Sequence, residues 1–116
     1  MADDGVARDG LRAGDMVIVT GGGGGFGRGF SLRLASMGAR IAVWDISEKD
    51  GAETTRLVRE TGGVAQFFQV DLADPVAIEA CISSTIAAMG TPYGVINNVP
   101  LRRGPPCFDF LIEDAV

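Results

Sequence analysis

The stretch MVIVTGGGGGFGRGFSLRLASMG, residues 16–38, decides the fold. Residues 16–20 are apolar or β-branched and predict a buried strand. Seven glycines follow within residues 21–29, where a segment with helical periodicity begins. Glycine has no Cβ, so the backbone N–H groups of such a loop approach an anion closely, and the first turn of a helix leaves its N–H groups unpaired. The stretch therefore predicts a strand, a phosphate-binding loop and a helix.

Short apolar runs alternate with helix-like segments along the rest of the chain. We expect strands at residues 16–20, 40–45, 64–70 and 93–97. Helical spacing of apolar residues is found in two sets, Phe26, Phe30, Leu34 and Met37, and Ile78, Ile82, Ile86 and Met89. This alternation predicts an α/β fold, a Rossmann-type doubly wound parallel sheet truncated after about four strands, with strands covered on both faces.

Helix boundaries are marked by residues suited to caps. Ser47 is expected to cap a middle helix over about residues 48–61, which stops at the glycines 62–63. Asp74 followed by Pro75 predicts the start of the next helix. Gly38 and Gly90 stand where helices end on a left-handed residue.

Composition limits the class of protein. The 116 residues, 47% hydrophobic and 22% charged, suit one globular domain, which we place at 14–116 after a mobile tail at 1–13. A net charge of −5 with scattered basic residues argues against nucleic acid as a partner. Neither a signal peptide nor a membrane span is expected. Two cysteines without any histidine argue against a metal site and favour the cytoplasm, with Cys81 in the core and Cys107 in a loop.

One carboxylate stands at the distance from the glycines that a dinucleotide site requires. Gly22-x-Gly24-x-x-Gly27 matches the general dinucleotide fingerprint, and Asp45 ends the second expected strand about 20 residues further on. A carboxylate there accepts hydrogen bonds from the ribose hydroxyls and repels a 2′-phosphate, which favours NAD over NADP. The alternatives are a flexible glycine linker and a solvated carboxylate at a strand end.

At these residues the chain resembles the short-chain dehydrogenase/reductase family. Residues 20–27 read Thr-Gly-x-x-x-Gly-Phe-Gly, the TGxxxGxG signature of that family. The resemblance implies that Gly21 makes the turn, that the backbone at Gly24, Gly25 and Phe26 meets the pyrophosphate, and that Gly27 lets helix and strand approach.

Two further motifs follow in the family's order. Asp71-Leu72 falls where the family places a carboxylate and an apolar residue against the adenine. Asn97-Asn98 matches the first half of the NNAG motif, which supports the central sheet and lines the cofactor cleft. Alternatives are a loop-capping carboxylate for Asp71 and ordinary strand-end hydrogen bonding for the two asparagines.

The catalytic residues of the family have no counterpart in these 116 residues. The family uses a serine and a Tyr-x-x-x-Lys unit, whereas Tyr93, the single tyrosine, is followed four residues later by Asn97, and Lys49 is the single lysine. We therefore assign no catalytic residue, and interpret Tyr93 as the first residue of a buried strand. Val99-Pro100 also replaces the Ala-Gly of NNAG, which affects nicotinamide placement. The sequence is interpreted as the cofactor half of a longer enzyme.

Three hypotheses follow for the function. The first is the NAD-binding portion of an oxidoreductase that interconverts a small-molecule alcohol and a carbonyl by hydride transfer. The second is a non-catalytic dinucleotide-binding module or degenerate homologue, and the third is a structural domain that binds nothing. The unpaired edge expected at residues 93–97 also predicts self-association as a homo-oligomer.

Overall fold

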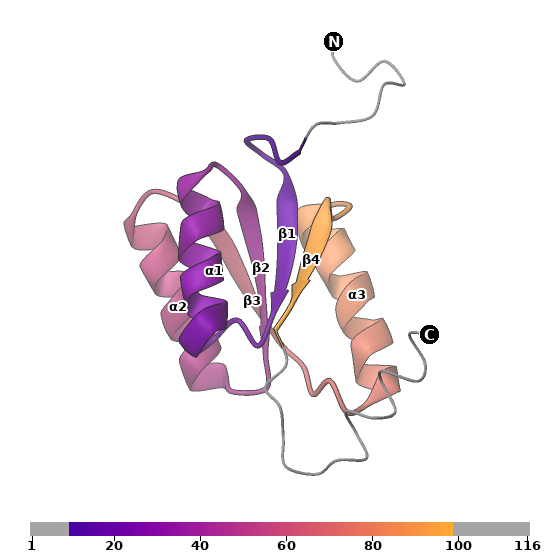
Figure 1. Ribbon diagram of the computed structural model, residues 1–116. Helices are drawn as coiled ribbons and strands as arrows, with labels where there is room; N and C mark the ends of the chain where they lie inside the picture. The colour runs from indigo at the N-terminus through magenta and orange to yellow at the C-terminus, as the bar shows by residue number, and fades with distance from the viewer. Residues whose placement is uncertain (1–9, 99–116) are drawn as a thin grey trace, which may run out of the picture.

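The computed structural model describes residues 10–98, which form four strands and three helices in alternation (Figure 1). The elements are β1 (Met16–Thr20), α1 (Gly25–Ser36), β2 (Arg40–Asp45), α2 (Glu48–Glu60), β3 (Val64–Gln69), α3 (Pro75–Met89) and β4 (Gly94–Asn97).

All strand pairs are parallel, and the sheet has the order β3-β2-β1-β4. The chain therefore runs outward from β1 to β3, crosses back, and places β4 on the other side of β1. Helices α1 and α2 cover one face of the sheet, and α3 covers the other (Figure 1). This arrangement confirms the predicted α/β, Rossmann-type doubly wound sheet.

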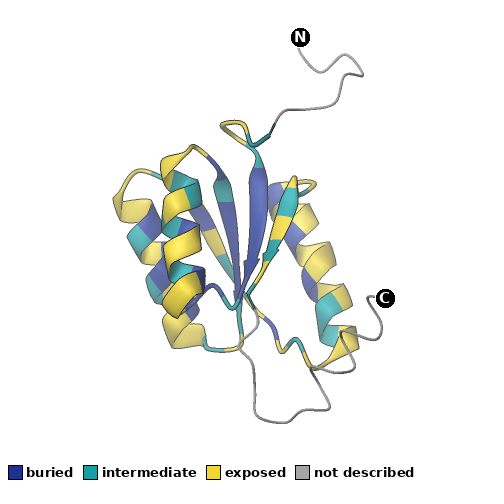
Figure 2. Cartoon of the chain, in the orientation of Figure 1, coloured by how far each residue is buried: buried dark blue, intermediate teal, exposed yellow. Residues whose placement is uncertain are grey.

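Two cores follow from the alternation of side chains along β1 and β2, one on each face of the sheet (Figure 2). The core beneath α3 contains Met16, Ile18, Ala42, Trp44, Val70, Cys81 and Met89. The core beneath α1 and α2 contains Val17, Val19, Ala39, Ile41, Val43, Val58 and Ala65. Since β1 and β2 supply both cores, they are the buried centre of the domain, as their continuous apolar runs predict.

The helix caps confirm the sequence signals. The Ser47 hydroxyl accepts a hydrogen bond from the N–H of Asp50, and the Asp74 carboxylate accepts from the N–H groups of Val76 and Ala77. Gly38 and Gly90 have φ angles of +94° and +90°, the left-handed region that ends α1 and α3.

The outer strands differ from prediction. β3 ends at Gln69 rather than Val70, and β4 begins at Gly94 rather than Tyr93. Tyr93 is 43% exposed, so the prediction that it starts a buried strand is wrong. Both strands lie at an edge of the described sheet, as we expected for residues 93–97. The side chains of β4 alternate between partly buried and exposed positions, and β3 has one buried residue, Ala65, among partly buried and exposed ones, whereas the sequence led us to expect strands covered on both faces.

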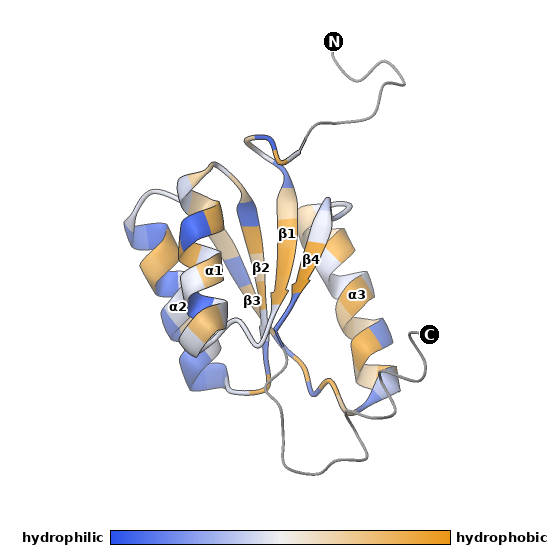
Figure 3. Ribbon diagram, viewed as in Figure 1, coloured by the Kyte–Doolittle hydropathy of each residue, from blue (hydrophilic) through white to orange (hydrophobic). Residues whose placement is uncertain are grey.

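The helices form where predicted, but some apolar residues of the helical pattern are exposed rather than packed against the sheet. In α1, Gly27 and Ser31 are buried while Phe26 and Phe30 are exposed. In α3, Cys81, Thr85 and Met89 are buried, and the outward side chains include Ile82 and Ile86. Figure 3 shows apolar residues, in orange, along much of the visible side of α3. The helical period therefore predicted these helices correctly, but apolarity alone did not identify the packed face.

The structure also bears on the cysteines, on membrane spans and on metal sites. Cys81 is a buried core residue, as predicted, and burial raises the pKa of its thiol. Cys107 lies outside the described residues. Within residues 10–98, no helix is both long enough and apolar enough to span a bilayer, and no three side chains of the metal-ligating types gather into a metal site.

One buried hydrogen bond joins β2 to α3 and generates a prediction. The indole Nε1 of Trp44 donates to the hydroxyl of Thr85 at 3.0 Å, and both residues are buried. Thr85→Val leaves the indole N–H without its acceptor, which is expected to lower the free energy of unfolding by about 1–3 kcal/mol.

Urea unfolding followed by the emission of Trp44, the single tryptophan, measures this change. Thr85→Ser retains the hydroxyl and is the matched control. Its free energy of unfolding is expected to fall by less than that of the valine variant. Equal stability of the valine variant and the wild type would contradict the assignment.

Candidate functional site

The glycine loop connects the carboxyl end of β1 to the start of α1. Gly21 turns the chain with φ at +62°, and the N–H of Gly22 donates to the carbonyl of Trp44 at 3.0 Å, so the loop crosses the end of β2. Gly27, in the first turn of α1, packs against the loop itself. A Cβ at this position would overlap the carbonyl oxygen of Gly21, so only glycine allows this close approach.

The first turn of α1 is open. No side chain caps this helix, in contrast to α2 and α3, and its N-cap residue is Gly24. Gly24, Gly25 and Phe26 are exposed, and a Cβ placed on either glycine would meet no atom within 4 Å. Unpaired N–H groups at the positive end of the helix dipole thus border open space, which is the geometry of an anion site.

Asp45 lies beside this loop, at the end of β2. Its Oδ2 accepts a hydrogen bond from the N–H of Gly23 at 2.8 Å, and its Oδ1 accepts from the N–H of Ser47 at 2.8 Å. Two backbone donors therefore fix the carboxylate. Each oxygen of a carboxylate can accept a second hydrogen bond, such as one from a hydroxyl.

The two asparagines at the end of β4 lie beside the other side of the loop. The N–H of Asn98 donates to the hydroxyl of Thr20 at 2.9 Å, and that hydroxyl lies 3.1 Å from Oδ1 of Asn97. The amide Nδ2 of Asn98 donates to the carbonyl of Gly21 at 3.3 Å. These bonds place both asparagines next to the turn that begins the loop.

Asp71 and Leu72 follow β3 at the same end of the sheet. The carboxylate of Asp71 is exposed and accepts a hydrogen bond from the N–H of Ala73 at 2.9 Å, and Leu72 packs partly buried against the core beneath α3. No hydrogen bond within residues 10–98 joins either residue to the glycine loop.

Comparison with known proteins agrees with this geometry. The family model described as short chain dehydrogenase matches residues 15–114. The chain belongs to the short-chain dehydrogenase/reductase family. Its curated relatives include a 2,5-dichloro-2,5-cyclohexadiene-1,4-diol dehydrogenase of Sphingobium indicum, 35% identical over 102 residues, and the short-chain dehydrogenase/reductase homolog YusS of Bacillus subtilis, 32% identical over 95 residues.

The relatives differ in how much of their length the chain spans. The match covers 87% of this chain but 40% of the diol dehydrogenase, and it covers 81% of this chain and 87% of YusS. Among solved structures, NAD+-bound xylitol dehydrogenase superposes with a TM-score of 0.75 at 29% identity, covering 77% of this chain and 34% of that one. A metagenomic short-chain oxidoreductase in complex with NADP superposes with a TM-score of 0.76 at 27% identity, covering 87% and 49%.

The short-chain dehydrogenase/reductases are a family of oxidoreductases with a dinucleotide-binding Rossmann fold. Tyr93 and Lys49 do not form the family's catalytic pair. The N–H of Tyr93 donates to the carbonyl of Met16, at the amino end of β1, whereas Lys49 lies in the first turn of α2, beyond the carboxyl end of β2. Val99 and Pro100 lie outside the described residues.

Arg28 is a residue of this region that sequence reasoning missed. Its Nη2 donates to the carbonyl of Gly23 at 2.7 Å, and its Nε donates to the hydroxyl of Thr54 at 2.9 Å. The available signal was a basic residue directly after the last glycine of the signature. The sequence alone did not indicate which residue Arg28 contacts, because Thr54 lies 26 residues away in α2.

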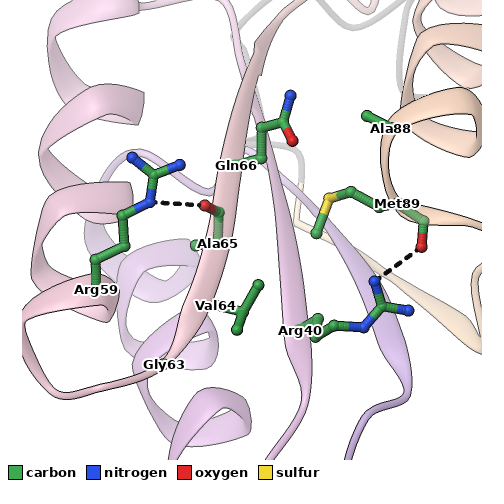
Figure 4. A pocket seen from close by; sticks show the side chains of 8 residues that line it. All are labelled: Arg40, Arg59, Gly63, Val64, Ala65, Gln66, Ala88 and Met89. Atoms are coloured by element: carbon green, nitrogen blue, oxygen red, sulfur yellow. Dashed lines mark hydrogen bonds between the residues drawn. The ribbon is translucent and has the colours of Figure 1, made fainter.

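A hollow at the opposite end of the sheet is not part of this site. Figure 4 shows it between the starts of β2 and β3 and the end of α3, lined by Arg40, Arg59, Gly63, Val64, Ala65, Gln66, Ala88 and Met89. Both guanidinium groups donate to backbone carbonyls there, Arg40 to Met89 at 2.9 Å and Arg59 to Ala65 at 3.0 Å. In parallel α/β sheets, ligands bind at the carboxyl ends of the strands instead.

The packing of α1 makes a prediction that separates two glycines of one helix. Gly27→Ala forces a Cβ against the carbonyl of Gly21 and is expected to lower the free energy of unfolding by about 1–3 kcal/mol or more. Gly29→Ala is the control, because its Cβ meets no atom within 4 Å and alanine favours the helix by up to about 1 kcal/mol.

Thermal and urea unfolding of both variants check the difference. Destabilisation of the two variants by the same amount would show that the close approach at Gly27 does not hold the loop in place.

Proposed function

We propose that the described region binds NAD(H), as the cofactor-binding part of an oxidoreductase that interconverts an alcohol and a carbonyl by hydride transfer. The observation that carries this proposal is the position of Asp45, which two backbone N–H groups hold beside the open glycine loop. Dinucleotide-binding folds that hold NAD place such a carboxylate at the ribose, next to such a loop at the pyrophosphate.

The residues present suit a pyrophosphate. The open first turn of α1 offers N–H groups at Gly25, Phe26 and Gly27, and the exposed Gly24 leaves room for the phosphates. Gly21 turns the chain away from β1 so that the loop lies across the strand ends. These residues are therefore proposed as the pyrophosphate site.

Asp45 supports NAD rather than NADP. Its free lone pairs suit both ribose hydroxyls, and its charge opposes a 2′-phosphate. The solved relatives hold NAD+ in one case and NADP in another, so the shared fold leaves selectivity to individual side chains. No basic residue stands between Thr20 and Gly27, nor directly after Asp45. The guanidinium of Arg28 beside the loop donates to the carbonyl of Gly23 and the hydroxyl of Thr54.

The remaining predicted residues complete the cleft. Asp71 and Leu72 follow β3 and are proposed to border the adenine, with the carboxylate exposed and the leucine half-buried. Asn97 and Asn98 end β4 beside Gly21 and are proposed to line the cleft toward the nicotinamide. The order of the strands, β3-β2-β1-β4, would thus follow the length of the dinucleotide.

Residues 1–116 are proposed to bind and orient the cofactor without moving a proton. When bound, the nicotinamide supplies or accepts the hydride, and the protein has to position it and provide a proton donor. The sequence contains no Tyr-x-x-x-Lys unit for that second task. A small-molecule alcohol or carbonyl is therefore proposed as the substrate of the whole protein, in the cytoplasm.

A second candidate function is a non-catalytic dinucleotide-binding module. Its support is the length of YusS, 87% of which this chain matches, together with the missing Tyr-x-x-x-Lys unit. The intact mass of the protein from its native source separates the two candidates. A mass near twice 12.1 kDa supports the oxidoreductase, and a mass of 12.1 kDa supports the module.

Cofactor selectivity gives the direct test of the proposed site. Trp44 precedes Asp45, so energy transfer from this tryptophan to the dihydronicotinamide reports binding of NADH or NADPH. Asp45→Ala is expected to weaken the binding of NADH about tenfold, since it removes a charge-assisted acceptor. The binding of NADPH is expected to stay unchanged or become tighter.

Glu79→Ala is the matched control, because it removes the same charge from an exposed position in α3. Equal effects of Asp45→Ala on the two cofactors would overturn the proposed selectivity. Absence of NADH binding by the wild type would overturn the proposed function.

Self-association is a further expectation from the exposed apolar surface. Ile82 and Ile86 of α3 are 42% and 43% exposed, and Val95 of β4 is 54% exposed. Such apolar groups favour contact with a second copy. Sedimentation velocity of the 116-residue chain is expected to show species larger than a monomer, which Ile82→Lys combined with Ile86→Lys reduces; a monodisperse wild-type monomer would contradict this expectation.

A further inference from the structure

We infer that Arg28 is a positioning residue for the adenosine half of the cofactor, acting through Gly23 on the carboxylate of Asp45. The inference rests on the proposed function and adds a residue to it. Arg28 belongs to the first turn of α1, and its side chain reaches across to α2. It thereby joins the two helices that flank the candidate ribose site.

Gly23 is held on both sides. Its N–H donates to Oδ2 of Asp45 at 2.8 Å, and its carbonyl accepts from Nη2 of Arg28 at 2.7 Å. The residue is buried, and a Cβ would come within 2.8 Å of Asp45 and of the backbone of α2. The N–H and the carbonyl belong to the two peptide groups that flank the Gly23 Cα, so the bonds to Asp45 and Arg28 together hold the backbone of Gly23 in one conformation.

The guanidinium is itself anchored. Nε of Arg28 donates to the hydroxyl of Thr54 at 2.9 Å, and Nη2 also lies 3.4 Å from the carbonyl of Asp50. Thr54 is fully buried, so this acceptor has a fixed position in α2. The planar guanidinium donates in fixed directions, which suits a rigid link between a helix and a loop.

The link closes a ring of contacts around Asp45. α2 begins at its N-cap Ser47, and the N–H of that same residue donates to Oδ1 of Asp45. Asp45 is thus fixed on one oxygen by the start of α2 and on the other by Gly23, and Arg28 ties Gly23 to α2. Loss of Arg28 would release Gly23 and leave one carboxylate oxygen without its backbone donor.

Two readouts test this role, and the first does not depend on the cofactor. The amide proton resonance of Gly23 reports its hydrogen bond to Asp45 in the protein without ligand. Arg28→Met is expected to shift this resonance upfield. Arg33→Met is the matched control, because it removes the same charge from an exposed position in the last turn of α1, and it is expected to leave the Gly23 resonance unmoved.

The second readout is a double-mutant cycle on NADH binding. Arg28→Met is expected to weaken NADH about tenfold when Asp45 is present, and less than about twofold in the Asp45→Ala background. A general loss of stability would weaken both backgrounds alike. Thr54→Val removes only the hydroxyl that anchors Arg28 and is expected to change both readouts in the same direction by a smaller amount. This variant provides the test if Arg28→Met does not fold.

The outcomes separate this inference from the proposed function. An unmoved Gly23 resonance in Arg28→Met and Thr54→Val overturns the role of Arg28, whether or not NADH binds. Equal loss of NADH affinity in both Asp45 backgrounds also overturns it, and a larger loss for NADPH than for NADH shows direct contact with phosphate instead. If the wild type does not bind NADH but Arg28→Met still shifts the Gly23 resonance as expected, the proposed function is overturned and the role of Arg28 is supported.

Discussion

The close approach of α1 to the glycine loop at Gly27 is the constraint on which the rest of the site depends. Without a side chain at Gly27, the first turn of the helix rests on the carbonyl of Gly21, and the loop must pass across the ends of β1 and β2. That path brings the N–H of Gly23 to Asp45. One steric condition therefore determines both the direction of the helix dipole and the surroundings of the carboxylate.

The parallel sheet adds the second condition, because it gathers the ends of strands that are distant in sequence. The hydroxyl of Thr20 joins β1 to the end of β4 across 78 residues, and the amide of Asn98 returns to the loop through Gly21. Asp45 joins β2 to the same loop from the other side. Polar groups from the ends of three strands thus surround the loop, although helices and strands separate Asp45 and Asn98 from it in the sequence.

The sequence predicted the features that depend on local chemistry. β1 and β2 have continuous apolar runs because both faces are covered, and Ser47 and Asp74 cap helices by bonds within three residues. Prediction from the sequence failed where contacts with distant residues determine how far a side chain is buried. Tyr93 is exposed rather than the first residue of a buried strand, and Phe26 and Phe30 of α1 are exposed although their spacing is helical. Arg28 was missed because no spacing rule reports a bond to Thr54 in another helix.

Relatives with the same fold hold different dinucleotides, NAD+ in xylitol dehydrogenase and NADP in the metagenomic oxidoreductase. A fold common to both cannot choose between them, so the choice must come from side chains and from how firmly they are held. In this chain the carboxylate of Asp45 is oriented by two backbone N–H groups, one from the loop and one from Ser47, the N-cap of α2. A carboxylate held in this way would lose little freedom on binding a ribose and would not swing away from a 2′-phosphate, so under the proposed NAD preference the same rigidity would favour one cofactor and disfavour the other.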